Sequence, residues 1–101
     1  MQKDAPILTL SVAASLLNLH PRTLMSYEKE GLIRPFRTST NRRLFSQQDL
    51  AAIQFVQFLI DKEHTNVAGV RLILRILEKA AAKYPTIKRD LFPDFQTREL
   101  I

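Results

Sequence analysis

Basic side chains are concentrated in the middle of this 101-residue chain. Residues 22–43 contain six Lys or Arg residues and two acidic residues, whereas residues 44–101 contain eight basic and seven acidic side chains. Most of the formal net charge of +5 therefore lies in the central stretch. Arginine pairs with phosphates and forms bidentate hydrogen bonds to guanine, so a focused basic patch of this kind favours a nucleic-acid partner.

The first element that must position these charges is a helix predicted over residues 21–30. Pro21 suits the first helical position, and Gly31 supplies the left-handed residue that ends a helix. At 3.6 residues per turn, one face of this helix carries Arg22, Met25, Ser26 and Lys29. Leu24 and Tyr27 lie on the opposite face, so that side is expected to pack while the first face contacts a partner.

The second element is a short β-hairpin that follows the helix. Residues 33–37 and 42–45 are predicted to form two strands around the polar turn at residues 38–41. Four arginines lie within this hairpin. The hairpin is therefore expected to present positive charge beside the helix.

A shorter helix is predicted before residue 21. It follows an apolar segment at residues 7–10, and either Thr9 or Ser11 is expected to cap it. Its predicted inward positions are Val12, Ala13, Leu16 and Leu17. Residues 18–20 then link two short helices in a helix-turn-helix pattern, in which the second helix is the candidate recognition helix.

Two longer helices are predicted after the hairpin. Ser46 and Asp49 resemble a capping box, and the helix they open should run to about Lys62 as the central core helix, without ligand chemistry. Asn66 is expected to cap a helix that runs to Lys83, with Arg71, Arg75 and Lys79 pointing outward and a buried stripe formed by Val67, Val70, Ile73, Leu74 and Leu77. Pro85 ends it, and residues 86–101 show no heptad pattern.

These elements predict a mostly α fold with a winged helix-turn-helix: two short helices, a small β-hairpin wing and two further helices. Residues 1–79 are assigned to the DNA-binding domain. Residues 80–101 are assigned to a short C-terminal tail that serves dimerisation or contact with a partner.

Several classes of protein are excluded by composition. The chain has no cysteine, so it has no disulfide, no zinc finger and no thiol sensor. His20 and His64 have no ligand-forming neighbours at suitable spacing, so neither a metal nor a cofactor is expected. No nucleophile is paired with a base and no glycine-rich phosphate loop is present, so we expect no enzyme. Neither a membrane span nor a signal peptide is visible, which predicts a cytoplasmic protein.

The central motif resembles that of the MerR family of transcription regulators over about residues 7–77. The residues that carry the resemblance are Tyr27, Glu28, Gly31, Leu32, Pro35 and the run Arg42-Arg43-Leu44-Phe45-Ser46. Within the family, residues 20–24 and 66–70 are most similar to the HspR-type repressors. Residues 41–46 are also similar to the GlnR-type nitrogen regulators.

The resemblance implies a dimer that binds an inverted repeat in double-stranded DNA, with the helix at residues 21–30 in the major groove and the wing at residues 37–43 on the flanking backbone. The candidate DNA-binding residues are Arg22, Thr23, Met25, Ser26, Tyr27, Lys29, Arg37, Asn41, Arg42 and Arg43. We expect a repressor of HspR-like type at the nucleoid, with a protein corepressor such as a chaperone. An assimilation enzyme is the partner that the GlnR type implies. A small-molecule effector is not expected, because the long dimerisation helix and effector domain of other branches are missing.

Alternatives remain open for several residues and for the function. Many relatives have arginine where this chain has Met25, which either packs on a thymine methyl group or belongs to the edge of the core. The Tyr27 ring is expected in the core, from where its hydroxyl can still reach a phosphate at the surface. Arg42 and Arg43 either contact DNA or are ordinary hairpin charges that discourage edge pairing, and one of the two can instead stack on or pair within the fold. The alternative functions are a DNA architectural factor of the excisionase kind and a protein-interaction module on a winged-helix scaffold.

Overall fold

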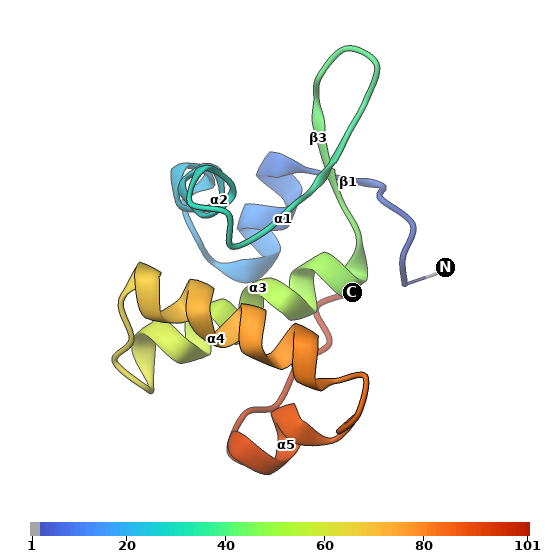
Figure 1. Ribbon diagram of the computed structural model, residues 1–101. Helices are drawn as coiled ribbons and strands as arrows, with labels where there is room; N and C mark the ends of the chain where they lie inside the picture. Colours follow the sequence, from blue (N-terminus) through green and yellow to red (C-terminus); the bar gives the residue numbers. More distant parts are fainter. Residues whose placement is uncertain (1–2) are drawn as a thin grey trace.

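In the computed structural model, residues 3–101 form five helices and three short strands (Figure 1). Met1 and Gln2 lie outside the described residues. They are the first two residues of the predicted DNA-binding domain and of the N-terminal stretch in which no signal peptide is expected. The elements in chain order are β1 (Leu8–Thr9), α1 (Leu10–Leu17), α2 (Pro21–Lys29), β2 (Phe36–Arg37), β3 (Arg43–Phe45), α3 (Gln47–Asp61), α4 (Val67–Ala80) and α5 (Ile87–Leu91). The predicted mostly helical, winged helix-turn-helix fold is confirmed.

Both ends of α2 are capped by local hydrogen bonds. At its start, Pro21 occupies the first turn and the His20 Nδ1 atom accepts a hydrogen bond from the Arg22 backbone N–H at 3.0 Å. At its end, Gly31 has a φ of 77°, and the N–H of Leu32 donates to the carbonyl of Tyr27 at 2.8 Å. This pattern is a Schellman motif, in which a left-handed residue lets the chain satisfy the last carbonyls. The predicted helix and its stop residue are therefore confirmed.

The wing is the β2–β3 hairpin, and it belongs to a three-stranded antiparallel sheet in the order β1-β3-β2. Arg37 pairs with Arg43 across the hairpin, and Leu8 pairs with Phe45 on the other side of β3. The predicted turn at residues 38–41 is confirmed, with Asn41 at a φ of 65° in the left-handed position that asparagine tolerates. The pairing of β1 was not predicted, because a two-residue strand has no readable periodicity.

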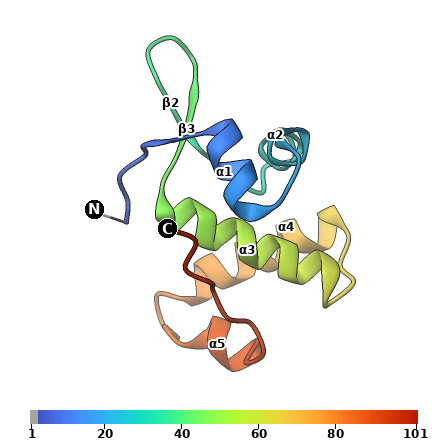
Figure 2. The same cartoon turned by 180° about the vertical axis from the view of Figure 1, so that it is seen from behind.

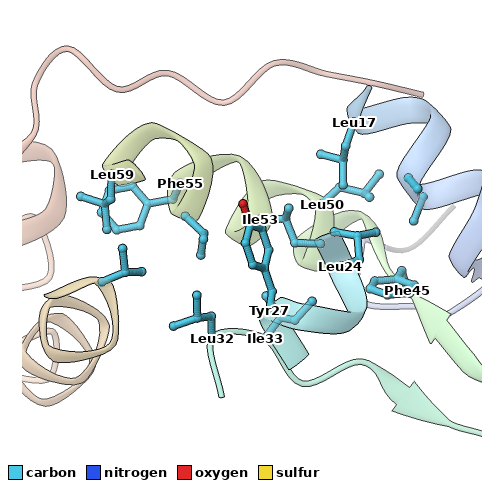
Figure 3. Packing of buried hydrophobic residues seen from close by; sticks show 14 of the residues in the cluster. Leu17, Leu24, Tyr27, Leu32, Ile33, Phe45, Leu50, Ile53, Phe55 and Leu59 are labelled. Carbon is cyan, nitrogen blue, oxygen red and sulfur yellow. The ribbon is translucent and has the colours of Figure 1, made fainter. Parts of the chain in front are cut away.

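Helix α3 lies at the centre of the hydrophobic core, as predicted. Leu24 from α2 and Phe45 from β3 are almost fully buried and point toward Leu50 and Ile53 of α3 (Figure 3). Helix α4 packs on another side of α3 (Figures 1 and 2). The core therefore joins the helix-turn-helix, the wing and the two longer helices into one unit.

One predicted core position in α1 is wrong. Val12 is 44% exposed, and Ala14 is buried in its place. Thr9 is the N-cap, so the helix starts at Leu10. Its inward stripe then follows the spacing i, i+3, i+4 and i+7 from Leu10, which includes Ala13, Ala14 and Leu17 and leaves Val12 on the solvent side.

Helix α4 ends at Ala80, earlier than the predicted Lys83, and the chain continues in turns. The N–H of Tyr84 still donates to the carbonyl of Ala80 at 2.8 Å. Because Pro85 disfavours the helical conformation for the residue before it, the chain must leave the helix before this point. A five-residue helix, α5, follows, although the sequence predicted no element there.

The C-terminal segment after α5 returns along α3 (Figure 2). The rings of Phe92 and Phe95 lie 5.5 and 5.1 Å from the ring of Phe55, measured between centroids. The buried Gln54 side chain donates to the carbonyl of Arg98 at 3.0 Å and accepts from its N–H at 2.8 Å. The segment is therefore held to α3 by both apolar contacts and hydrogen bonds.

Candidate nucleic-acid interface

The outward face of α2 carries the predicted polar and charged side chains. Arg22, Met25, Ser26 and Lys29 are all exposed, and Thr23 is half-buried. Together with Glu28 and Arg43, the four exposed residues line an open hollow between α2 and the wing. The structure thus brings the predicted face of the recognition helix together with one of the predicted wing arginines.

Glu28 joins α2 to both strands of the wing. Its carboxylate accepts two hydrogen bonds from Arg37, from Nε at 3.2 Å and from Nη2 at 2.9 Å, and one from Arg43 Nε at 2.6 Å. Arg37 and Arg43 lie opposite each other in the hairpin register, so their side chains share a face of the sheet and reach one carboxylate. Arg43 is therefore the member of the Arg42 and Arg43 pair that bonds within the fold.

The role of Glu28 was missed in the sequence, where it appeared only in the Tyr-Glu pair of the motif. Arg37 follows Glu28 by nine positions in the sequence, and Arg43 follows it by fifteen. Contacts at such separations depend on where the hairpin packs against α2. The available signal was that Glu28 is an acidic residue within a basic stretch and is flanked by residues of the motif.

The environment of Glu28 favours its ionised form. Burial alone disfavours the charge, but the hydrogen bonds and positive charges of Arg43 and Arg37 outweigh burial, so the pKa of the Glu28 carboxyl is lowered from its ordinary value of 4.5. A carboxyl with a lower pKa in the folded than in the unfolded state stabilises the fold above its unfolded pKa. That stabilisation is lost as the pH falls through the folded pKa.

Replacing Glu28 with glutamine is therefore expected to lower the free energy of unfolding at pH 7 by about 1 kcal/mol, because charge-assisted hydrogen bonds become neutral ones. The difference between wild type and Glu28→Gln should shrink as the pH falls below about 4.5 and the wild-type carboxyl protonates. Urea unfolding of both proteins between pH 7 and pH 3 measures this difference. An equal difference at both ends of the range would show that the charge of Glu28 contributes nothing.

The C-terminal end of α2 is also attached to α4. Arg71 donates from Nε to the backbone carbonyl of Glu30 at 3.0 Å and from Nη2 to the Glu30 carboxylate at 3.1 Å. Arg71 was predicted as an outward residue, and it is exposed, yet its guanidinium reaches the C-cap of α2. The orientation of α2 is thus fixed at Glu28 by the wing and at Glu30 by α4.

Tyr27 lies on the packing side of α2. Its ring is buried in the core, and its hydroxyl points toward α3, where it accepts a hydrogen bond from the side chain of Gln57 (Figure 3). Burial and the nearby charge of Asp61 raise the pKa of the Tyr27 hydroxyl. The predicted place of the ring in the core is confirmed, whereas the hydroxyl, for which a phosphate contact was predicted, is bonded to α3 on the packing side of the helix.

The turn of the wing projects away from the helical body (Figures 1 and 2). Asn41 and Arg42 are exposed there, and the backbone carbonyl of Asn41 accepts a hydrogen bond from Arg37 Nη1 at 2.8 Å. Within residues 3–101, the Arg42 guanidinium makes no hydrogen bond or ion pair. Arg42 is therefore the wing arginine that is available to an external anion.

Residues 3–101 contain no group of three or more His, Cys, Asp or Glu side chains that could hold a metal ion. No helix among them combines the length and apolar character that crossing a membrane requires.

Comparison with known proteins places this geometry among DNA-binding regulators. The model of the MerR HTH family regulatory proteins matches residues 8–76. A Streptomyces coelicolor protein that carries the name heat shock protein HspR is 37% identical over 81 residues, which are 80% of this chain and 54% of that protein. The HTH-type transcriptional regulator GlnR of Bacillus cereus is 32% identical over 77 residues, which are 76% of this chain and 59% of GlnR. The chain thus spans a little more than half the length of these relatives.

A solved structure has a similar fold. It is the crystal structure of HiNmlR, described as a MerR family regulator lacking the sensor domain and bound to promoter DNA. The two chains superpose with a TM-score of 0.63 and are 26% identical in sequence. The similarity covers 86% of this chain and 68% of HiNmlR.

Proposed function

This chain belongs to the MerR family of helix-turn-helix regulatory proteins, as the sequence motif predicted, and from this premise we propose that it binds an inverted repeat in double-stranded DNA as a homodimer. Its relatives are regulators rather than enzymes, in agreement with the predicted absence of catalysis. We assign α2 to the major groove and the wing to the flanking phosphates.

The observation that best supports the proposal is the joint presentation of α2 and the wing. The exposed face of α2 lies beside the wing, and Glu28 holds the two elements in one orientation through Arg37 and Arg43. A major groove admits an α-helix, and contacts to the neighbouring backbone fix its register. In this arrangement Arg22, Met25 and Ser26 face the bases, while Lys29 and the wing face phosphates.

The proposed regulatory role is repression of HspR-like type, in the cytoplasm and at the nucleoid. The supporting observation is the 37% identity to the HspR protein. We assign regulation to a protein corepressor such as a chaperone. The C-terminal segment 80–101 is proposed to serve dimerisation or partner contact, with exposed apolar side chains such as Tyr84 and Leu91 available for it.

Salt dependence tests whether the basic surface meets phosphates. Among residues 3–101, no ion pair is made by four of the six basic side chains in the stretch 22–43, namely Arg22, Lys29, Arg34 and Arg42. The logarithm of the association constant should fall against the logarithm of the salt concentration with a slope of about −3.6 per subunit if these four contact phosphates. The slope should be about −5.4 if Arg37 and Arg43 contribute as well. Fluorescence anisotropy with a labelled duplex measures this slope. A slope near zero would contradict the proposed interface.

The Arg42→Ala variant is expected to weaken binding to all sequences alike and to reduce the slope by about one, because Arg42 is assigned to a phosphate. Arg75→Ala removes the same charge from an exposed position of α4, which lies outside both the proposed DNA interface and segment 80–101, and should leave the slope unchanged. Equal effects of the two variants would mean that only the overall charge matters.

A further inference from the structure

Met25 is an apolar side chain exposed among polar and charged groups. It is 41% exposed on the outward face of α2. The hollow between α2 and the wing is lined by Arg22, Met25, Ser26, Glu28, Lys29 and Arg43, so Met25 is the apolar member of this set of described residues. The core side of α2 carries two buried residues. Leu24 directly precedes Met25 in the sequence, and Tyr27 directly follows Ser26. The exposure of Met25 therefore argues against a place in the core.

The edges of the bases determine what such a side chain can recognise. In the major groove, bases present hydrogen-bond donors and acceptors, and the C5-methyl group of thymine is the apolar exception. Methionine is flexible and polarizable, so it adapts its shape to a small apolar group. Resting on the proposed function, we propose that Met25 is a specificity-determining residue that packs against a thymine methyl group in each half-site.

The position of this thymine follows from the helix. Arg22 and Met25 are three residues apart on the same face of α2, which corresponds to a rise of about 4.5 Å along the helix. Successive bases on one strand are about 3.4 Å apart along the duplex axis. The thymine that Met25 contacts therefore lies within about two base pairs of the base that Arg22 contacts.

Two parallel selections from random duplex libraries test the inference, one library containing thymine and the other uracil, which lacks only the methyl group. With the thymine library, the wild-type protein should enrich a motif that contains this thymine. With the uracil library, the preference at that position should weaken roughly fourfold, as expected for losing burial of one methyl group, while the other positions are unchanged.

Two variants at Met25 provide the matched comparison. Met25→Ala should not distinguish thymine from uracil at this position and should retain the base specified by Arg22, whereas Met25→Leu should retain the distinction because leucine also packs against a methyl group. Thermal unfolding checks that both variants are folded, which is expected for an exposed position.

The outcomes separate the inference from the proposed function. Identical motifs in the two libraries, or full thymine preference in Met25→Ala, would overturn the role of Met25 and leave the proposed function standing. In the second case, the half-buried Thr23 would be the next residue to test for the methyl contact. If the wild-type protein enriched no motif in either library, sequence-specific binding would be wrong, and the inference would fall with it.

Discussion

Replacing Arg22 with alanine is expected to relax base preference at one position of each half-site and to weaken binding to the preferred sequence by about 1–3 kcal/mol. Arg22 lies in the first turn of α2, on its exposed face, and its guanidinium makes no hydrogen bond or ion pair within residues 3–101. A side chain in this position can form a bidentate pair with guanine. The backbone N–H of Arg22 donates to the His20 side chain. Alanine at position 22 preserves this hydrogen bond, so the fold should not change.

The measurement is a set of dissociation constants for Arg22→Ala on a series of operators that differ at single positions. Arg42→Ala is the matched control, since it removes the same group from the wing and should weaken all operators equally. Uniform weakening by Arg22→Ala would assign Arg22 to the phosphate backbone and contradict its role in reading a base.

Replacing Phe55 with alanine is expected to lower the free energy of unfolding by about 3–5 kcal/mol, a large fraction of the stability of a small domain. Phe55 is 2% exposed, and its ring contacts those of Phe58, Phe92 and Phe95. The Lys88 Nζ atom also lies 4.2 Å from the centre of the ring. Truncation removes one of the contacts through which α3 holds α5 and the C-terminal segment.

Urea unfolding measures the effect, and Phe36→Ala provides the control. Phe36 lies in β2 and is 54% exposed, so its truncation should change the free energy of unfolding by less than about 0.5 kcal/mol. If Phe55→Ala lowered the free energy of unfolding by less than about 1 kcal/mol, the packing of the C-terminal segment against α3 would be contradicted.

The parts of the fold that could be predicted from the sequence depend on local signals. Pro21 and Gly31 mark the ends of α2 because each is suited to one backbone position, and both positions are confirmed. The Ser46 capping box opens α3 as predicted, with its hydrogen bonds between residues three positions apart. Interactions of this kind are encoded within a few residues and are visible without the tertiary structure.

The parts that were missed depend on contacts between distant residues. Gln54 and Arg98 bond across 44 positions, and nothing near either residue indicates the other. The pairing of Glu28 with Arg37 and Arg43 requires both the hairpin register and its packing against α2. The candidate face of α2 could be read from periodicity, whereas the connection between that face and the wing could not.

Selection of the purified protein against a random duplex library at about physiological salt tests the central claim most directly, because specific binding then stands clear of electrostatic background. The account predicts enrichment of an inverted repeat, with two half-sites related by the symmetry of a dimer. Retention of DNA without an enriched motif, as expected of an architectural factor, would contradict the claim. Failure to retain any DNA would contradict it as well and would favour a protein-interaction module.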